Sequence, residues 1–133
     1  MKAPICPYCG NESEITNGSK IYPFCDDLIG LRFWVCWPCD AYVGCHKANN
    51  KLGFTGIEPL GTLANAELRK LRSEVHKIFD PLWKNRVFRS RKRAYNWLAN
   101  VLKIPTDECH IGMFGINRCI NAIELIKKAH YEN

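Results

Sequence analysis

Two cysteine pairs with the same spacing are the residues of this chain best suited to chemistry: Cys6 with Cys9, and Cys36 with Cys39. Two residues between the thiols of a pair allow one tight backbone turn to direct both sulfurs at a single ion. Four such thiolates form a closed tetrahedral zinc site, and a closed site is structural. The sequence therefore predicts one structural zinc ion, with two disulfides or four free thiols as the alternatives.

The other chemically distinctive residues are two adjacent Cys-His pairs, Cys45-His46 and Cys109-His110. They could meet at a second zinc site, although neighbouring residues on a strand point apart, so each pair more naturally supplies one ligand than two. The favoured interpretation is buried thiols in the core with hydrogen-bonded histidines. The second metal site is kept as the less expected alternative.

A third candidate site is the stretch 84–93, which carries six positive charges and no negative one. It joins a loop to a helix that Ser90 is expected to cap, so free backbone N–H groups would accompany the charges. Such a place suits phosphates, and Phe88 and Tyr95 could stack on bases. The alternative is a solvated helix end. The predicted nucleic-acid-binding residues are Lys84, Arg86, Arg89, Arg91, Lys92 and Arg93.

Catalytic constellations are weaker. A nucleophilic enzyme would need Cys45 or Cys109 as a thiolate beside a histidine. A metal nuclease would need an open site, for example one formed by His46, His110 and Asp80. Neither set has a recognisable spacing, and no phosphate-binding glycine loop is present, so the sequence favours a protein that is not an enzyme.

The elements that must position the zinc ligands are short strands. An Asn17-Gly18 turn is expected within residues 14–22, β-rich residues 31–35 lead into the second cysteine pair, and residues 41–45 leave it. Knuckle, hairpin, knuckle and strand is the order of a zinc ribbon. Residues 49–61 are rich in Gly and Pro and predict a linker or an ordered connecting loop.

The second half predicts about three helices. Thr62 is expected to cap the first helix, which should stop at Asp80-Pro81. Ser90 should cap the second helix, and Ile104-Pro105 should end it. The third helix should begin near Ile116 or Asn117, with Cys119, Ile120, Ile123 and Ile126 facing inward.

The predicted fold class is therefore α+β: an N-terminal zinc ribbon, a small antiparallel sheet with two cysteine knuckles, packed on a C-terminal bundle of about three helices. The expected domains are residues 1–58, the ribbon with its connecting loop, and residues 59–133, the bundle. The two could also form one compact unit. At 133 residues the chain is long enough to bury a core.

Charge is divided unevenly between these halves. Residues 1–60 carry five basic and six acidic side chains, net −1, whereas residues 61–133 carry fourteen and seven, net +7. Four thiolates and one zinc ion would take the first half to −3. No apolar run approaches the ~18 residues of a membrane span, and no signal peptide is evident, so a cytoplasmic protein with reduced thiols is expected.

The chain also resembles a known family. The residues that carry the resemblance lie in seven segments: 6–10, 34–39, 41–46, 59–69, 79–83, 94–98 and 109–114. These segments are similar to those of a small zinc-finger-containing family found mainly in bacteriophages and prophages. The resemblance implies a compact phage-encoded accessory protein that acts in the cytoplasm of the bacterial host.

Together these observations favour a non-catalytic protein with a structural zinc ribbon that binds nucleic acid through a basic helical surface. The first alternative is a protein–protein inhibitor or modulator of a host polymerase or defence enzyme, because the ribbon is acidic. The second alternative is a metal-dependent hydrolase or nuclease. No membrane partner is expected.

Overall fold

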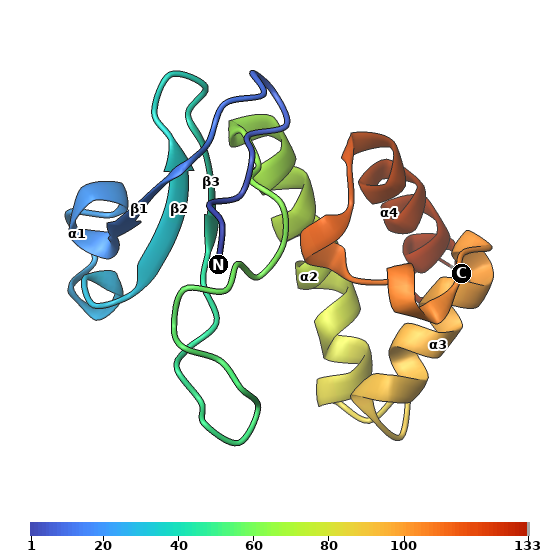
Figure 1. The fold of residues 1–133 in the computed structure, drawn as a ribbon. Coiled ribbons are helices and arrows are strands. Elements are labelled where there is room, and N and C mark those ends of the chain that lie inside the picture. Colours follow the sequence, from blue (N-terminus) through green and yellow to red (C-terminus); the bar gives the residue numbers. More distant parts are fainter. Residues whose placement is uncertain (133) are drawn as a thin grey trace. The chain divides into compact units, whose positions relative to one another are not determined.

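The computed structural model describes residues 1–132. The chain divides into two compact units, Met1–Ala66 and Glu67–Asn133. We call them the ribbon unit and the helical unit. No helix in the described residues combines the length and apolar character that a membrane crossing requires. The expected α+β class is confirmed, because a small antiparallel sheet with a cysteine cluster precedes three long helices (Figure 1).

The ribbon unit is built on a three-stranded antiparallel sheet in the order β1-β2-β3. The strands are β1 (Glu14–Asn17), β2 (Arg32–Cys36) and β3 (Ala41–Gly44). Trp34 on the central strand is paired with Ile15 on one side and Val43 on the other. The two strands expected around the second knuckle are therefore present, each within one residue of its predicted bounds.

The expected tight turn at Asn17-Gly18 is wrong. Asn17 instead caps the short helix α1 (Gly18–Ile21), its side-chain oxygen accepting a 3.0 Å hydrogen bond from the Ser19 N–H. A 3-10 helix, η1 (Asp26–Leu28), follows before β2. Gly18 is required for close packing, because a Cβ there would lie 1.6 Å from the Leu28 carbonyl oxygen. The connection between β1 and β2 therefore contains two short helices, and Figure 1 shows it at the ends of these strands.

The core of the ribbon unit includes two of the zinc-ligand cysteines, together with Trp34, Ala41 and Leu63. The loop of residues 49–61 is ordered and hydrogen-bonded to this core: Trp34 Nε1 donates to the Ile57 carbonyl at 2.6 Å, and the Leu60 N–H donates to the Gly44 carbonyl at 2.8 Å. Hydrogen bonds from Thr55, and from backbone N–H groups of the loop, lower the pKa of Glu58 to about 2.

The first helix begins later than expected. Thr62 does not cap it, because Ala64 is paired with Tyr42 by two backbone hydrogen bonds of 3.0 and 3.1 Å, which hold this segment beside β3. The helix α2 spans Ala66–Lys84. It also passes through Pro81, where it was expected to stop. Pro81 lies in the last turn, where its missing N–H removes at most one helical hydrogen bond, and the next residue, Leu82, is buried.

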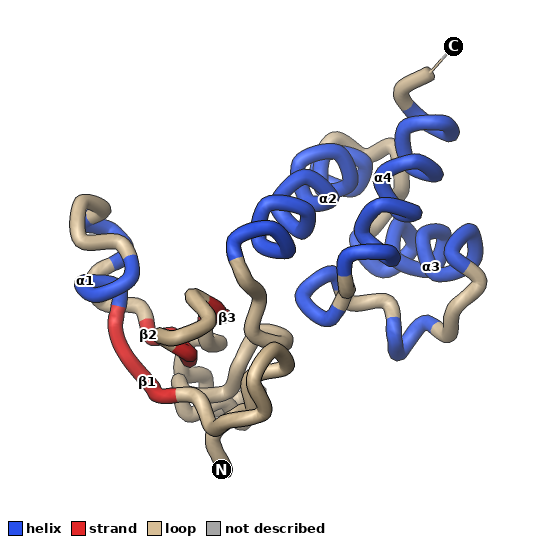
Figure 2. Tube along the Cα trace, turned by 90° about the horizontal axis from the view of Figure 1, so that it is seen from above, coloured by secondary structure: helices blue, strands red, loops and turns tan. Residues whose placement is uncertain are grey.

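The helical unit continues with α3 (Arg91–Leu102) and α4 (Ile116–His130), separated by the 3-10 helices η2 (Thr106–Glu108) and η3 (Ile111–Met113). Figure 2 shows α2, α3 and α4 as blue coils. Ser90 caps α3 as predicted: its hydroxyl accepts a 3.1 Å hydrogen bond from the Arg93 N–H. The predicted start of α4 is also confirmed.

All three helices contribute to the core of the helical unit. Its largest fully buried side chains are Phe79, Leu98, Ile111, Phe114 and Ile126. Arg72 is buried with them and donates from Nε to the Phe114 carbonyl at 2.9 Å. Ile120, expected to face inward, is instead 47% exposed, because the buried stripe of α4 runs through Cys119, Ala122 and Ile126.

Candidate metal centre and basic surface

The first cysteine knuckle is a hairpin-like turn. The Gly10 N–H donates to the Cys6 carbonyl at 2.9 Å, and the Cys6 N–H donates to the Asn11 carbonyl at 2.8 Å. Buried Ser13 closes the base of the turn, because both its backbone N–H and its hydroxyl donate to the Pro4 carbonyl. These bonds fix Cys6 inside the core and leave Cys9 at the surface.

The second knuckle connects β2 to β3. Cys36 is the last residue of β2 and is buried, while Cys39 lies in the turn and is partly exposed. The Asp40 N–H donates to the Trp37 carbonyl at 3.1 Å, and the chain then enters β3 at Ala41. Each knuckle therefore contributes a first cysteine from the core and a second from the turn.

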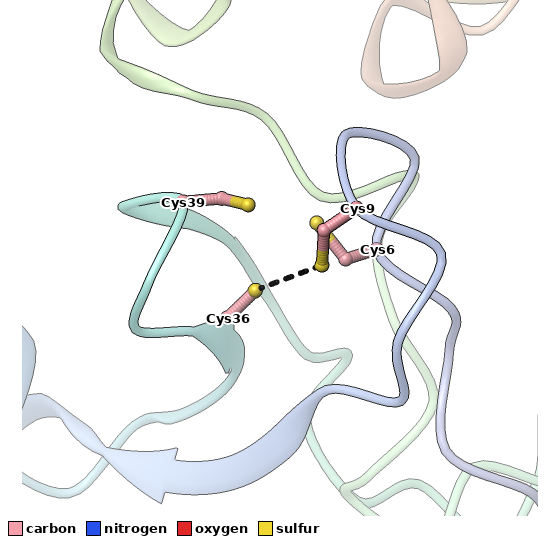
Figure 3. A group of neighbouring side chains, drawn as sticks. All are labelled: Cys6, Cys9, Cys36 and Cys39. Atoms are coloured by element: carbon pink, nitrogen blue, oxygen red, sulfur yellow. Dashed lines mark hydrogen bonds between the residues drawn. The ribbon is translucent and has the colours of Figure 1, made fainter.

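The four sulfurs meet as the spacing predicted. All lie within 4.8 Å of one another, and the Cys9 and Cys36 sulfurs are 3.6 Å apart (Figure 3). Tetrahedral Zn–S bonds of about 2.3 Å place the sulfurs about 3.8 Å apart, whereas a disulfide needs about 2.05 Å. The thiols thus fit one zinc ion, and all eight cysteines of the chain are free.

Proton affinity differs among these thiols. A hydrogen bond from the Asn11 backbone N–H lowers the pKa of Cys9 to about 7, while desolvation and the neighbouring thiols raise the pKa of Cys39 to about 12. Zinc must displace the protons that the thiols retain. Because four protein ligands complete the tetrahedron, the chemistry supplied by the ion is structural.

The comparison with known families agrees with this geometry. The model of a family described as a zinc-finger-containing domain matches residues 2–129. The chain belongs to this family. No curated protein and no solved structure matches the chain.

In this zinc-finger-containing protein the predicted basic residues all belong to the helical unit. Lys84 ends α2, Arg86 and Arg89 lie in the connecting loop, and the other three occupy the first turn of α3. All six side chains are exposed, and within residues 1–132 none is paired with a carboxylate. We call this set the basic surface: Lys84, Arg86, Arg89, Arg91, Lys92 and Arg93.

Aromatic rings lie directly beneath the basic surface. The Lys84 ammonium and the Arg91 guanidinium are 5.5 and 5.6 Å from the Trp83 ring centroid, and Arg91 is also 5.2 Å from that of Tyr95. Phe79 meets the Tyr95 ring edge-on at 4.8 Å. Phe88, the other ring expected to stack on bases, instead packs against Trp97 and His130. Of the two residues predicted to stack on bases, Tyr95 is therefore the one that lies beside the charged side chains of the basic surface.

Sequence reasoning missed a groove of about 500 Å³ whose lining includes Arg91 and Lys92. It is lined from α3 by Tyr95 and Asn96 and from the facing segment by Thr106, Asp107 and His110. Helical spacing could have placed residues 91, 92, 95 and 96 on one face of α3. No local signal pairs that face with residues 106–110.

The two Cys-His pairs lie in different units, so the second metal site stays a prediction. In the ribbon unit His46 stacks on Phe54 at 4.0 Å, and burial raises the pKa of Cys45. In the helical unit burial raises the pKa of Cys109 to about 11. Among residues 1–132, the knuckle cysteines are the group of metal-ligand side chains that the structure brings together.

Proposed function

We propose that this protein binds nucleic acid through its basic surface without catalysing a reaction, as a phage- or prophage-encoded accessory protein in the bacterial cytoplasm. The observation that carries the proposal is the basic surface itself. Six exposed cations gather within ten residues with no carboxylate partner among residues 1–132. The phage origin rests on the resemblance of the sequence to the family's members.

The position of the charges supports an anionic partner. Arg91, Lys92 and Arg93 occupy the first turn of α3, where cations oppose the helix dipole at a cost of a few tenths of a kcal/mol. The first N–H groups of a helix have no intrahelical acceptor, and the Ser90 hydroxyl satisfies that of Arg93. A phosphate placed here would receive both side-chain charge and backbone hydrogen bonds.

The ribbon unit is less suited to phosphate. Its 66 residues carry five basic and six acidic side chains, and bound zinc with four thiolates would make the net charge −3. Like charges would repel a nucleic-acid backbone. We therefore assign the zinc ion a role in folding and assign phosphate binding to the helical unit, whose net charge is +7.

The ribbon unit instead supports the second candidate, a modulator of a host enzyme. Phe24 is 96% exposed in the loop between α1 and η1, and Trp37 at the tip of the second knuckle is 48% exposed. Exposed aromatic side chains are enriched at protein–protein interfaces. A stoichiometric host protein retained from bacterial lysate, and lost when Phe24 is changed to Ser, would support this function.

A hydrolase is the weakest candidate. Burial raises the pKa of both Cys45 and Cys109, which is the wrong direction for a thiolate nucleophile at neutral pH. Asp80, the carboxylate considered for an open metal site, lies 3.1 Å from the His76 ring nitrogen one turn earlier on α2.

The test is a fluorescence-anisotropy titration of labelled oligonucleotides at several salt concentrations. Replacing Arg89, Arg91 and Arg93 by Ala should weaken binding strongly and reduce the slope of log K against log salt by about 2 to 3. The matched control replaces the exposed Lys70, Lys127 and Lys128 by Ala, which removes the same charge from residues that are not part of the basic surface. Lys70 lies fourteen residues before Lys84 on α2, about 21 Å along the helix.

Equal weakening by both triple variants would show that only net charge matters. No binding to DNA or RNA at low salt would overturn the proposal.

A further inference from the structure

The groove beside the basic surface has the dimensions of a small-ligand site. Its volume of about 500 Å³ falls within the range of about 300–1,000 Å³ typical of such sites. One wall is the exposed face of the first two turns of α3, and the other is the segment that contains η2. Because both walls belong to the helical unit, the groove is a feature of that unit alone.

The groove and the basic surface share Arg91 and Lys92. A phosphate held by these two side chains would therefore lie against the α3 wall of the groove. The facing wall differs, because Asp107 contributes a carboxylate. That charge would repel a phosphate but would accept hydrogen bonds from amino groups. The polarity thus changes from anion-binding on the α3 wall to hydrogen-bond-accepting on the facing wall, which matches a nucleotide whose phosphate lies on the first wall and whose base reaches the second.

The remaining lining residues offer contacts that a nucleobase uses. The half-buried Tyr95 ring, with the Arg91 guanidinium 5.2 Å from its centroid, provides flat surfaces for stacking. The side chains of Asn96, Thr106 and His110 are exposed, and none of them has a hydrogen-bond partner within residues 1–132. Free amide, hydroxyl and imidazole groups can bond to the edge of a base.

We propose that this groove accepts one unstacked base of a single-stranded nucleic acid whose phosphates lie on the basic surface. The inference rests on the proposed function and adds a preference to it. Bases in a duplex are stacked and paired, so their faces are not available to a side groove, whereas a single strand can turn a base outward. The protein should therefore bind single strands more tightly than duplexes.

Three labelled DNA probes of equal length separate the two contributions: a 12-nucleotide single strand of mixed sequence, the same strand with abasic sites throughout, and the 12-base-pair duplex. All three present phosphates, but only the first presents accessible bases. The normal single strand should bind at least about tenfold more tightly than the abasic strand, because stacking of the bound base adds to the affinity. It should also bind more tightly than the duplex.

Side-chain variants test the groove itself. Asn96→Ala combined with His110→Ala should lower the affinity for the normal single strand toward that for the abasic strand, because the hydrogen bonds to the base edge are lost, and should leave the abasic affinity unchanged. Asn100→Ala is the matched control, since Asn100 is exposed one turn further along α3 and does not line the groove. Circular dichroism checks that each variant folds.

The outcomes separate this inference from the proposed function. Equal affinity for the normal and abasic strands, or tighter binding of the duplex, would overturn the groove and leave the basic surface in place. Loss of abasic-strand affinity in the groove variants would also overturn it. No affinity for any probe would overturn both proposals.

Discussion

At the scale of single residues, the position after the second cysteine of each knuckle has a special backbone conformation. Gly10 has a φ of 78° and Asp40 a φ of 49°, both in the left-handed region. Glycine adopts this conformation without strain, and aspartate is among the few other residues that tolerate it. The two knuckles thus use different residues for the same left-handed conformation, because in both the chain must reverse its direction after the second cysteine.

Replacing Gly10 by Ala should therefore destabilise the zinc-bound ribbon unit by about 1–2 kcal/mol. A Cβ at this position meets nothing within 4 Å, so the loss would come from backbone strain and not from a clash. Chemical denaturation of the zinc-loaded protein measures it. Gly30→Ala is the control, since its Cβ also enters open space but its φ is ordinary. Equal stability of the two variants would contradict the argument.

At the scale of elements, the sequence predicted what depends on local pattern. Ser90, followed by the apolar stripe of α3, identified both the cap and the helix, and the cysteine spacing identified the knuckles. The errors occurred where contacts with residues distant in the sequence determine the local structure. Asn17-Gly18 resembles a turn, but packing against Leu28 makes it a helix cap, and Ala64 fits a helical stripe but pairs with Tyr42. The groove escaped detection for the same reason.

Gly18→Ala tests whether that distant contact is as restrictive as its geometry indicates. The new methyl group would lie 1.6 Å from the Leu28 carbonyl oxygen, so α1 or η1 must shift. Overpacking of this kind should lower the free energy of unfolding by about 2–3 kcal/mol. The measurement is again denaturation of the zinc-loaded protein, with Gly30→Ala as the reference. A Gly18→Ala variant as stable as that reference would show that the junction is adaptable.

At the scale of the whole molecule, the two units differ in both charge and source of stability. The ribbon unit has 66 residues, is net negative once metallated, and includes zinc-ligand cysteines in its core. The helical unit is net positive and is stabilised by large buried side chains such as Phe79 and Phe114. The metal-dependent part and the proposed phosphate-binding part are therefore separable in principle, which allows the role of zinc to be tested directly.

Removing zinc with a chelator should unfold the ribbon unit, because structural zinc contributes about 10–16 kcal/mol and a domain this small has little stability to spare. Hydrogen exchange followed by mass spectrometry should show residues 1–66 losing protection while 67–132 retain it, and Cys36→Ser should reproduce the effect.

The reciprocal variant, Phe79→Ala, should lower the stability of the helical unit by about 3–5 kcal/mol while one zinc stays bound. Oligonucleotide binding should accordingly survive chelation but weaken where Phe79→Ala unfolds the helices. A chelated protein whose first 66 residues stay protected would show that zinc is not what stabilises the ribbon.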